Sequence, residues 1–125
     1  NVVVFGGDAG KNFKTMLASS FEKGVKLEKV FINFPDPWFK DRHKKRRFVN
    51  EKFLAEIADF VDSSTEFIFQ TDQEFLFNET VEVLEASDFS DIAYFDESPL
   101  GVQTDWEKAK VAEGNKIWRM VFKKK

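Results

Sequence analysis

The apolar residues of the chain follow two different patterns. Short apolar runs, of the kind that form buried strands, occur at residues 2–5, 29–34, 66–70, 90–95 and 116–123. Between them lie stretches in which apolar residues recur every three or four positions, at residues 12–21, 50–61 and 71–85. Because strands alternate with helical crossovers of this length, the pattern predicts an α/β fold with a right-handed, mostly parallel sheet.

Individual segments refine this prediction. Residues 29–34 are apolar on both faces of a strand, which suits a parallel sheet covered by helices on each side. Asn50 is a favourable cap for the helix at 50–61. Residues predicted to face inward from the two later helices are Phe53, Ile57 and Val61, and Phe77, Val81 and Leu84. Residues 96–115 form a connection longer than most in compact domains, and such loops are often functional.

The composition is that of one folded domain, predicted to span residues 1–125. Hydrophobic residues make up 42% and charged residues 33%, which is ordinary for a soluble globular protein. The absence of Cys excludes disulfides, thiolate zinc sites and a cysteine nucleophile. The start of the chain lacks the basic segment of a signal peptide, and no run approaches the roughly 20 apolar residues of a membrane span. These features predict a cytoplasmic protein with no membrane partner.

The distribution of charge matters more than its sum. A net charge of −3 argues against a nucleic-acid partner, because phosphate binding needs basic surface. Between Lys40 and Arg47, however, six of eight residues are Lys or Arg. The sequence therefore predicts one basic patch on an otherwise acidic body. A basic run of this kind can also be only a solvated face.

Four polar clusters are expected to converge at the carboxyl ends of the strands, where open parallel sheets bind their ligands. They are residues 7–9, 35–38, 71–72 and 104–107. In the second cluster Asp36 stands between Pro35 and Pro37, and each proline restricts both its own backbone and the residue before it. This arrangement can aim a carboxylate. The alternative is a proline-rich turn in which Asp36 is simply solvated.

The other candidate residues also have structural explanations. Thr71 and Thr104 each begin a Thr-Asp-x-Glu segment that fits a helix capping box. His43 has no partner ligands at metal-binding spacing, so it is a contact for RNA or solvent rather than for a metal. Residues 6–10 match neither a P-loop nor the dinucleotide fingerprint.

The most specific signal is the segment Phe34-Pro35-Asp36-Pro37-Trp38 followed by the basic run through Arg47. With the later Thr-Asp-x-Glu segments and the ending at residues 114–122, it resembles the bacterial tRNA (guanine-N7-)-methyltransferase family along nearly all of the chain. The resemblance implies a partial Rossmann-like class I methyltransferase sheet, with an antiparallel C-terminal strand and the N-terminal strands missing. It also implies S-adenosylmethionine (SAM) as methyl donor and tRNA as partner.

The resemblance assigns roles residue by residue. Cofactor contacts are expected from Asp8, Ala9 and Asp36, with Asp36 also the catalytic carboxylate between cofactor and base. Substrate contacts are expected from Lys40, Asp72, Thr104, Asp105, Trp106 and Glu107. RNA contacts are expected from Arg42, His43, Lys44, Lys45, Arg46 and Arg47. No metal ion is implied. Gln73 departs from the family, which more often has an aromatic residue there, and this weakens the details of base stacking.

The chemistry needs little from the protein beyond orientation and electrostatics. Guanine N7 has an exposed lone pair, so it can accept a methyl group without first losing a proton. Carboxylates nearby would stabilise the positive charge that the purine acquires. Asp72 or Glu107 could accept hydrogen bonds from the Watson–Crick edge of guanine and distinguish it from adenine.

Further expectations concern the chain as a whole. Because the segment that grips the methionine end of SAM lies before the matched region, we expect this chain alone to bind SAM weakly and to be inactive. Its exposed sheet edge could mediate self-association. Two alternative functions are a non-catalytic RNA-binding α/β module, which uses only the basic run, and a small α/β interaction domain without RNA.

Overall fold

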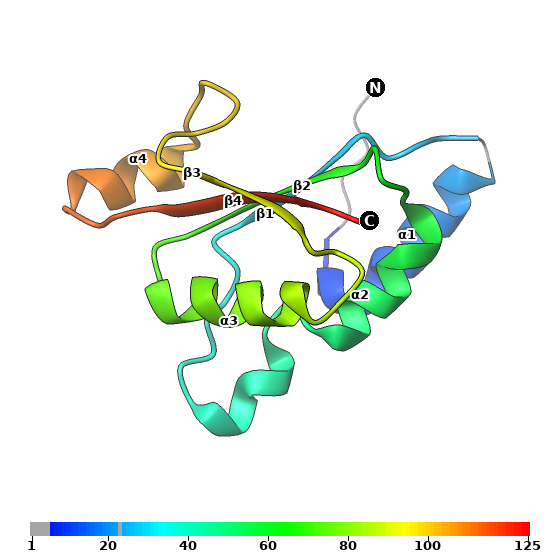
Figure 1. Cartoon of the computed structure of the whole chain (residues 1–125), viewed down its shortest axis with the longest axis horizontal. Helices are drawn as coiled ribbons and strands as arrows, with labels where there is room; N and C mark the ends of the chain where they lie inside the picture. The colour runs from blue at the N-terminus through cyan, green and yellow to red at the C-terminus, as the bar shows by residue number, and fades with distance from the viewer. Residues whose placement is uncertain (1–5, 23) are drawn as a thin grey trace.

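The computed structural model describes residues 6–22 and 24–125 of the chain (Figure 1). The predicted strand at residues 2–5 lies outside the described residues. The helices are α1 (Ala9–Phe21), α2 (Glu51–Ile57), α3 (Glu74–Glu85) and α4 (Asp105–Ala112), with short 3-10 helices η1 (Asp41–Arg46) and η2 (Ala58–Phe60). The strands are β1 (Lys29–Asn33), β2 (Glu66–Thr71), β3 (Asp91–Phe95) and β4 (Trp118–Lys123).

The strands of the described residues form one four-stranded sheet in the order β1-β2-β4-β3. β1 and β2 are parallel, whereas β4 runs antiparallel to both of its neighbours, β2 and β3. Three strands therefore point the same way and the C-terminal strand points the opposite way. The mixed α/β architecture predicted from the sequence is confirmed. β1 is an edge strand in this sheet, and self-association through the edge remains a prediction.

The helix predicted at 50–61 begins as expected and ends earlier. The side-chain oxygen of Asn50 accepts a hydrogen bond from the backbone N–H of Phe53 at 2.8 Å, as a helix cap does. The α-helix ends at Ile57 and tightens into η2, so that Val61 is already in extended backbone. Phe53 and Ile57 are both buried in the core, as predicted.

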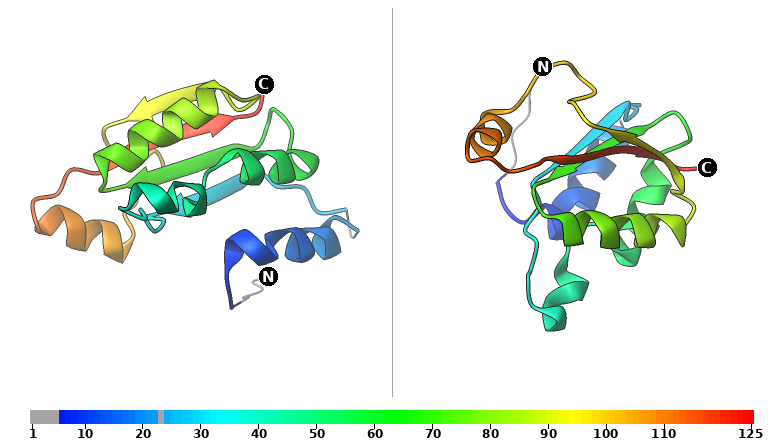
Figure 2. Two further views of the ribbon diagram at one scale, coloured as in Figure 1. Left: turned by 90° about the horizontal axis from the view of Figure 1, so that it is seen from below. Right: turned by 60° about the vertical axis from the view of Figure 1, so that its left-hand side comes forward.

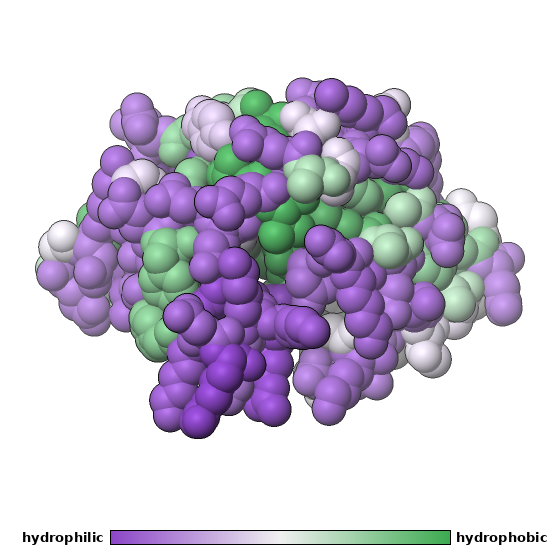
Figure 3. Space-filling view, turned by 60° about the horizontal axis from the view of Figure 1, so that its bottom comes forward, coloured by the Kyte–Doolittle hydropathy of each residue, from purple (hydrophilic) through white to green (hydrophobic). Residues whose placement is uncertain are grey.

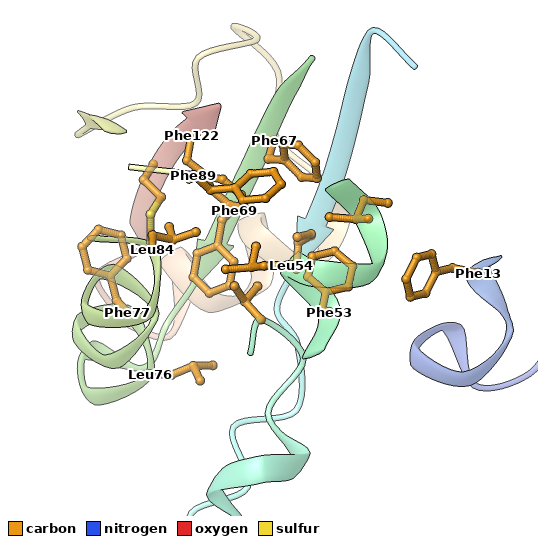
Figure 4. Close-up of a cluster of buried hydrophobic side chains, with 14 residues drawn as sticks. Phe13, Phe53, Leu54, Phe67, Phe69, Leu76, Phe77, Leu84, Phe89 and Phe122 are labelled. Carbon is orange, nitrogen blue, oxygen red and sulfur yellow. The ribbon is translucent and has the colours of Figure 1, made fainter. Parts of the chain in front are cut away.

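The hydrophobic core lies on one face of the sheet, between the strands and helices α1, α2 and α3 (Figures 1 and 2). Alternate residues of the central strand, Phe67 and Phe69, are completely buried on this face. The ring of Phe67 stacks on that of Phe122 from β4 with a centroid distance of 4.8 Å. From the helices, Leu54 and Leu84 complete this layer (Figure 4). Many of the chain's phenylalanines are thus structural.

Covering of the sheet by helices on both faces was predicted, and this expectation is wrong for the described residues. Helices α1 to α3 all lie on the core face, while α4 and the loop before it cover only one end of the other face (Figure 2). β1 shows the difference within one strand: Ile32 on the core face is 6% exposed, whereas Phe31 on the other face is 48% exposed. An apolar run alone does not reveal which face is covered.

Two acids at the amino ends of the parallel strands have lowered pKa values. Asp62 accepts hydrogen bonds from the hydroxyl and backbone N–H of Ser64, and these, with Lys26, lower its pKa to about 2. Glu66 pairs at 2.7 Å with Lys29, which lowers the pKa of that carboxyl. These charges join β1 to β2 at the end of the sheet opposite the predicted site.

No helix within residues 6–22 and 24–125 combines the length and apolar character that crossing a bilayer requires.

Candidate functional site

The chain makes a strained turn where β1 ends. Phe34 and Trp38 have φ angles of 48° and 45°, so left-handed backbone stands on both sides of the segment 35–37. For residues other than glycine this conformation costs about 1–3 kcal/mol each, and it persists only where surrounding contacts impose it. One such contact is the backbone N–H of Phe34, which donates to the carbonyl of Gln70 at 2.8 Å and so extends the β1–β2 ladder.

Arg47 imposes the rest of this conformation. Its Nε donates to the carbonyl of Pro37 and its Nη2 to the carbonyl of Trp38, each at 3.0 Å. The arginine is only 5% exposed and forms an ion pair with Glu79 of α3. Arg47 was predicted to contact RNA, but in the structure its guanidinium is committed to the turn and to Glu79. We therefore assign it to positioning the turn and leave it out of the RNA-contacting set.

Asp36 lies at the exposed tip of this turn. Its Oδ1 accepts a hydrogen bond from the backbone N–H of Trp38 at 3.0 Å, which fixes the carboxylate relative to the backbone. Asp36 therefore has little conformational freedom. Proline restricts the backbone on either side of it, Phe34 and Trp38 beyond the prolines are left-handed, and Arg47 hydrogen-bonds the carbonyls of residues 37 and 38. Asp36 is exposed to solvent as well as held by this turn, so its catalytic role stays a prediction.

The basic run folds into the 3-10 helix η1 instead of a loop, and it projects from the body beneath α3 (Figure 1). Lys40, just before it, is exposed, as are Arg42, Lys44, Lys45 and Arg46, whereas His43 is half-buried. The guanidinium of Arg46 lies 5.2 Å from the centre of the Trp38 ring, and the ring of His43 meets the same indole edge-on at 5.3 Å. The indole thus ties the basic surface to the Asp36 turn.

A groove of about 730 Å³ joins the turn to the start of α1. Asp8 and Asp36 both line it, and Lys45 and Arg46 lie on its basic side. Asp8 precedes α1 without capping it by its side chain, and it is exposed at the groove. Ala9, which begins α1, is exposed beside it. The tertiary structure therefore brings together two acids predicted to contact the cofactor and part of the basic run.

The second part of the site lies at the end of β2. Asp72 follows this strand directly, and because β1 and β2 are parallel and in register at Asn33 and Gln70, Asp72 and Asp36 lie at the same edge of the sheet. A carboxylate oxygen of Asp72 lies 3.7 Å from the ammonium of Lys110 on α4. Lys110 could not be identified from the sequence, where it resembles any surface lysine.

Trp106 connects the two parts. Its ring is 57% exposed and meets the ring of Phe34 at a centroid distance of 6.4 Å, and the ammonium of Lys110 lies 4.9 Å from its centre. α4 thus approaches both the Asp36 turn and Asp72. Of the cluster predicted at 104–107, Trp106 thus lies near the turn, whereas the contact with Asp72 comes from Lys110, which the prediction did not include.

The two Thr-Asp-x-Glu segments behave differently. Thr104 forms a complete capping box with Glu107, because each side chain accepts from the other's backbone N–H, at 3.1 and 3.3 Å. This cap begins α4, a helix within the long connection at 96–115, so the capping box predicted at Thr104 is confirmed. Thr71 does not cap α3, which begins at Glu74 after Gln73, so the capping explanation is wrong there.

The side chain of Glu107 is buried in an ion pair. It is 1% exposed, and its carboxylate accepts from Arg119 of β4, with Nε to Oε1 at 3.0 Å. Arg119 also donates to the carbonyl of Asp96 at 2.5 Å, so it joins both α4 and the start of the connection before it to β4. The structure gives Glu107 a structural partnership, and we do not retain it as a substrate contact. Asp105, by contrast, is exposed in the first turn of α4.

Within the described part of the chain, no group of three or more His, Asp or Glu side chains is arranged to hold a metal ion.

Comparison with known proteins agrees with this geometry. The model of a family described as "Putative methyltransferase" matches residues 1–120. The chain belongs to this family.

Curated proteins that are similar to this chain carry a more specific name, tRNA (guanine-N(7)-)-methyltransferase. The protein of that name from Clostridium novyi is 40% identical over 74 residues, which are 59% of this chain and 34% of the relative. Those of Trichormus variabilis and Clostridium perfringens strain SM101 are 34% identical over 112 residues and 35% over 115 residues, covering 86% and 87% of this chain and 52% of each relative. The chain spans a third to about half of the length of these relatives.

The resemblance predicted from the segment 34–47 is thereby confirmed. The matches extend over most of the chain, so they include the turn at Asp36, Asp72 and α4 within one family relationship.

Proposed function

We propose that this chain is a catalytic portion of an enzyme that transfers a methyl group from SAM to N7 of a guanine in the variable loop of tRNA. One observation carries the proposal. Asp36 is held by a strained, clamped turn in a groove that it shares with Asp8 and with the cations Lys45 and Arg46. The carboxylates of the site would attract the positively charged cofactor and the methylated purine. The cations beside them would attract the phosphates of the RNA.

The residues of the groove suit SAM. SAM supplies an electrophilic methyl group on a positively charged sulfur. The carboxylate of Asp8 can accept a hydrogen bond from the adenine amine, with Ala9 beside it, and the carboxylate of Asp36 can face the positive charge at sulfur. Both acids line the same groove, whose volume of about 730 Å³ is in the range of small-molecule sites. We propose Asp8, Ala9 and Asp36 as cofactor contacts on this basis.

Asp36 would act by electrostatics and position, not as a base. Guanine N7 attacks with its own lone pair, so the N–C bond forms as the C–S bond breaks, and the bonding pair leaves with sulfur. No proton has to be removed at N7. The purine becomes positively charged during this transfer, and a carboxylate fixed by Trp38 N–H stabilises that charge without reorganising. Lining up the reactants supplies the remaining acceleration.

The exposed cations would bring tRNA to the groove. Lys40, Arg42, Lys44, Lys45 and Arg46 are exposed, and the surrounding face is strongly hydrophilic on the part that projects (Figure 3). Their proximity to Asp36 places phosphates beside the reacting base. His43 adds a half-buried ring against Trp38. We propose these residues as the RNA-contacting set, without Arg47.

Charge reversal of Arg42 and Arg46 together to Glu is expected to weaken tRNA binding strongly in the complete protein. If the wild type neutralises four or five phosphates, a plot of log affinity against log salt concentration should have a slope of about −3 to −4. Each phosphate contact that is lost should make this slope less steep by about 1. Fluorescence titration with tRNA at several salt concentrations measures both quantities.

The matched control reverses Lys123, the last residue of β4, and Lys125 just beyond it, both at the opposite end of the sheet, and should change the slope little. An unchanged salt slope in the Arg42 and Arg46 variant would contradict a role for η1 in RNA binding and favour an interaction domain without RNA.

A methyl-transfer assay tests the function itself. The complete protein is incubated with tRNA and methyl-labelled SAM, and the modified position is mapped in the RNA. We expect label in a guanine of the variable loop, at N7. Binding of tRNA without any methyl incorporation would instead support the non-catalytic RNA-binding module.

A further inference from the structure

Lys110 lies between Asp72 and Trp106 of the proposed site. Its position in the sequence does not indicate this. Its ammonium is 3.7 Å from Asp72 Oδ2, 4.9 Å from the centre of the Trp106 ring and 3.6 Å from Glu113 Oε2. The lysine side chain is 22% exposed and that of Asp72 is 14% exposed, whereas that of Glu113 is 60% exposed. The Lys110–Asp72 pair is therefore half-enclosed but open to a ligand.

We propose that Lys110 is a specificity-determining residue that, with Asp72, distinguishes guanine from adenine; this inference rests on the proposed function. The pair places a hydrogen-bond donor next to an acceptor. Guanine presents the complementary order on its edge, with the O6 acceptor next to the N1–H and N2–H donors. The ammonium would donate to O6, while the carboxylate accepts from N1–H and N2–H.

Adenine presents the opposite order, and this provides the discrimination. Its N6 amine is a donor where guanine has the O6 acceptor, and its N1 is an acceptor where guanine has a donor. In the same pose adenine would direct a donor at the ammonium of Lys110 and a lone pair at the carboxylate of Asp72. Each member of the pair would then be left desolvated without a partner, which is the strongest way to reject a wrong base.

The pair also suits the charge that develops on the base. A lone ammonium near O6 would oppose the positive charge that N7 acquires, but Asp72 balances it, so the pair is neutral in sum. Asp36 then remains the carboxylate that stabilises the transition state. Trp106, with its ring 57% exposed at the same edge, offers a face for the purine to lie against.

Base substitution in the substrate tests this assignment in the complete protein. Methyl transfer is measured on tRNAs that carry guanosine or 2,6-diaminopurine riboside at the target position, because the latter keeps N7 but has an amine in place of O6. The wild type should prefer guanosine. Lys110→Met should lower kcat/KM for guanosine by roughly ten- to a hundredfold, the size of one good base contact, and leave the rate on diaminopurine unchanged.

Two further variants make the result specific. Lys110→Arg keeps the donor and should retain most of the preference for guanosine. Lys108→Met, on the same helix with its side chain 63% exposed, should behave as the wild type. If Lys110→Met slowed both substrates by the same factor, or neither, the inference would be overturned. If the wild type methylated no guanosine in tRNA, the proposed function itself would be overturned. This result differs from a changed preference of the Lys110 variant between guanosine and diaminopurine.

Discussion

Replacing Asp36 with Asn is expected to lower kcat for methyl transfer by roughly a hundredfold or more, with little change in tRNA affinity. The substitution removes the negative charge that faces the developing cation and the cofactor sulfur. It keeps an oxygen that can accept from Trp38 N–H, so the turn should survive. The measurement is single-turnover methyl transfer beside a tRNA binding titration, both on the complete protein.

Asp41→Asn provides the control for this experiment. Asp41 is exposed in the first turn of η1, five residues along the chain from Asp36, and its loss changes the net charge of the segment equally. Methyl transfer by this variant should stay close to that of the wild type. Equal activity of the Asp36→Asn and Asp41→Asn variants would mean that the Asp36 carboxylate has no part in catalysis, and the RNA-binding module would become the better interpretation.

Replacing Arg119 with Met is expected to reduce the free energy of unfolding by about 3–5 kcal/mol, the cost of leaving one partner of a buried ion pair alone. Glu107 would lose its charged partner while only 1% exposed, and the carbonyl of Asp96 would lose its donor. Urea unfolding of the complete protein, followed by intrinsic tryptophan fluorescence, measures the change. Trp106 and Trp118 lie in the affected region and should report it.

The double variant Arg119→Met with Glu107→Gln separates the ion pair from packing. Removing both charges together should recover a large part of the lost stability, because no isolated charge remains buried. A double variant no more stable than Arg119→Met alone would show that Arg119 acts through its contact with the Asp96 carbonyl and its packing. It would also undermine the assignment of Glu107 to the interior.

Much of the fold follows from local patterns. Period-two and continuous apolar runs predicted β1 to β4 to within a residue or two, and Asn50 predicted the start of α2. Hydrophobic periodicity did not predict α4, because its apolar residues Trp106 and Val111 are exposed and produce no clear amphipathic face; only the capping box at Thr104 indicated its start. That helix depends on the Thr104 cap and on the Glu107–Arg119 pair, which forms only when β4 is in the sheet.

The sequence predicted the residue types of the candidate site, and the structure showed which of them are buried in ion pairs and which are exposed. Asp36 between two prolines and the exposed cations of η1 could be identified from the sequence, because proline restriction and charge density are local properties. Arg47 and Arg46 look alike in the sequence, yet one is buried against Glu79 and the other lies on Trp38 at the surface. Nothing in their immediate neighbours distinguishes them.

The sequence by itself determined the order of the strands and of helices α1 to α3, the restricted backbone on either side of Asp36 and the presence of one basic patch. The tertiary structure alone decided which charges are free for a ligand: it buried Arg47 and Glu107 and brought Lys110 to Asp72. The physical reason is the range of the forces involved. Backbone restriction and hydrophobic periodicity act between neighbours in the chain, whereas burial and ion pairing depend on residues that meet only after folding.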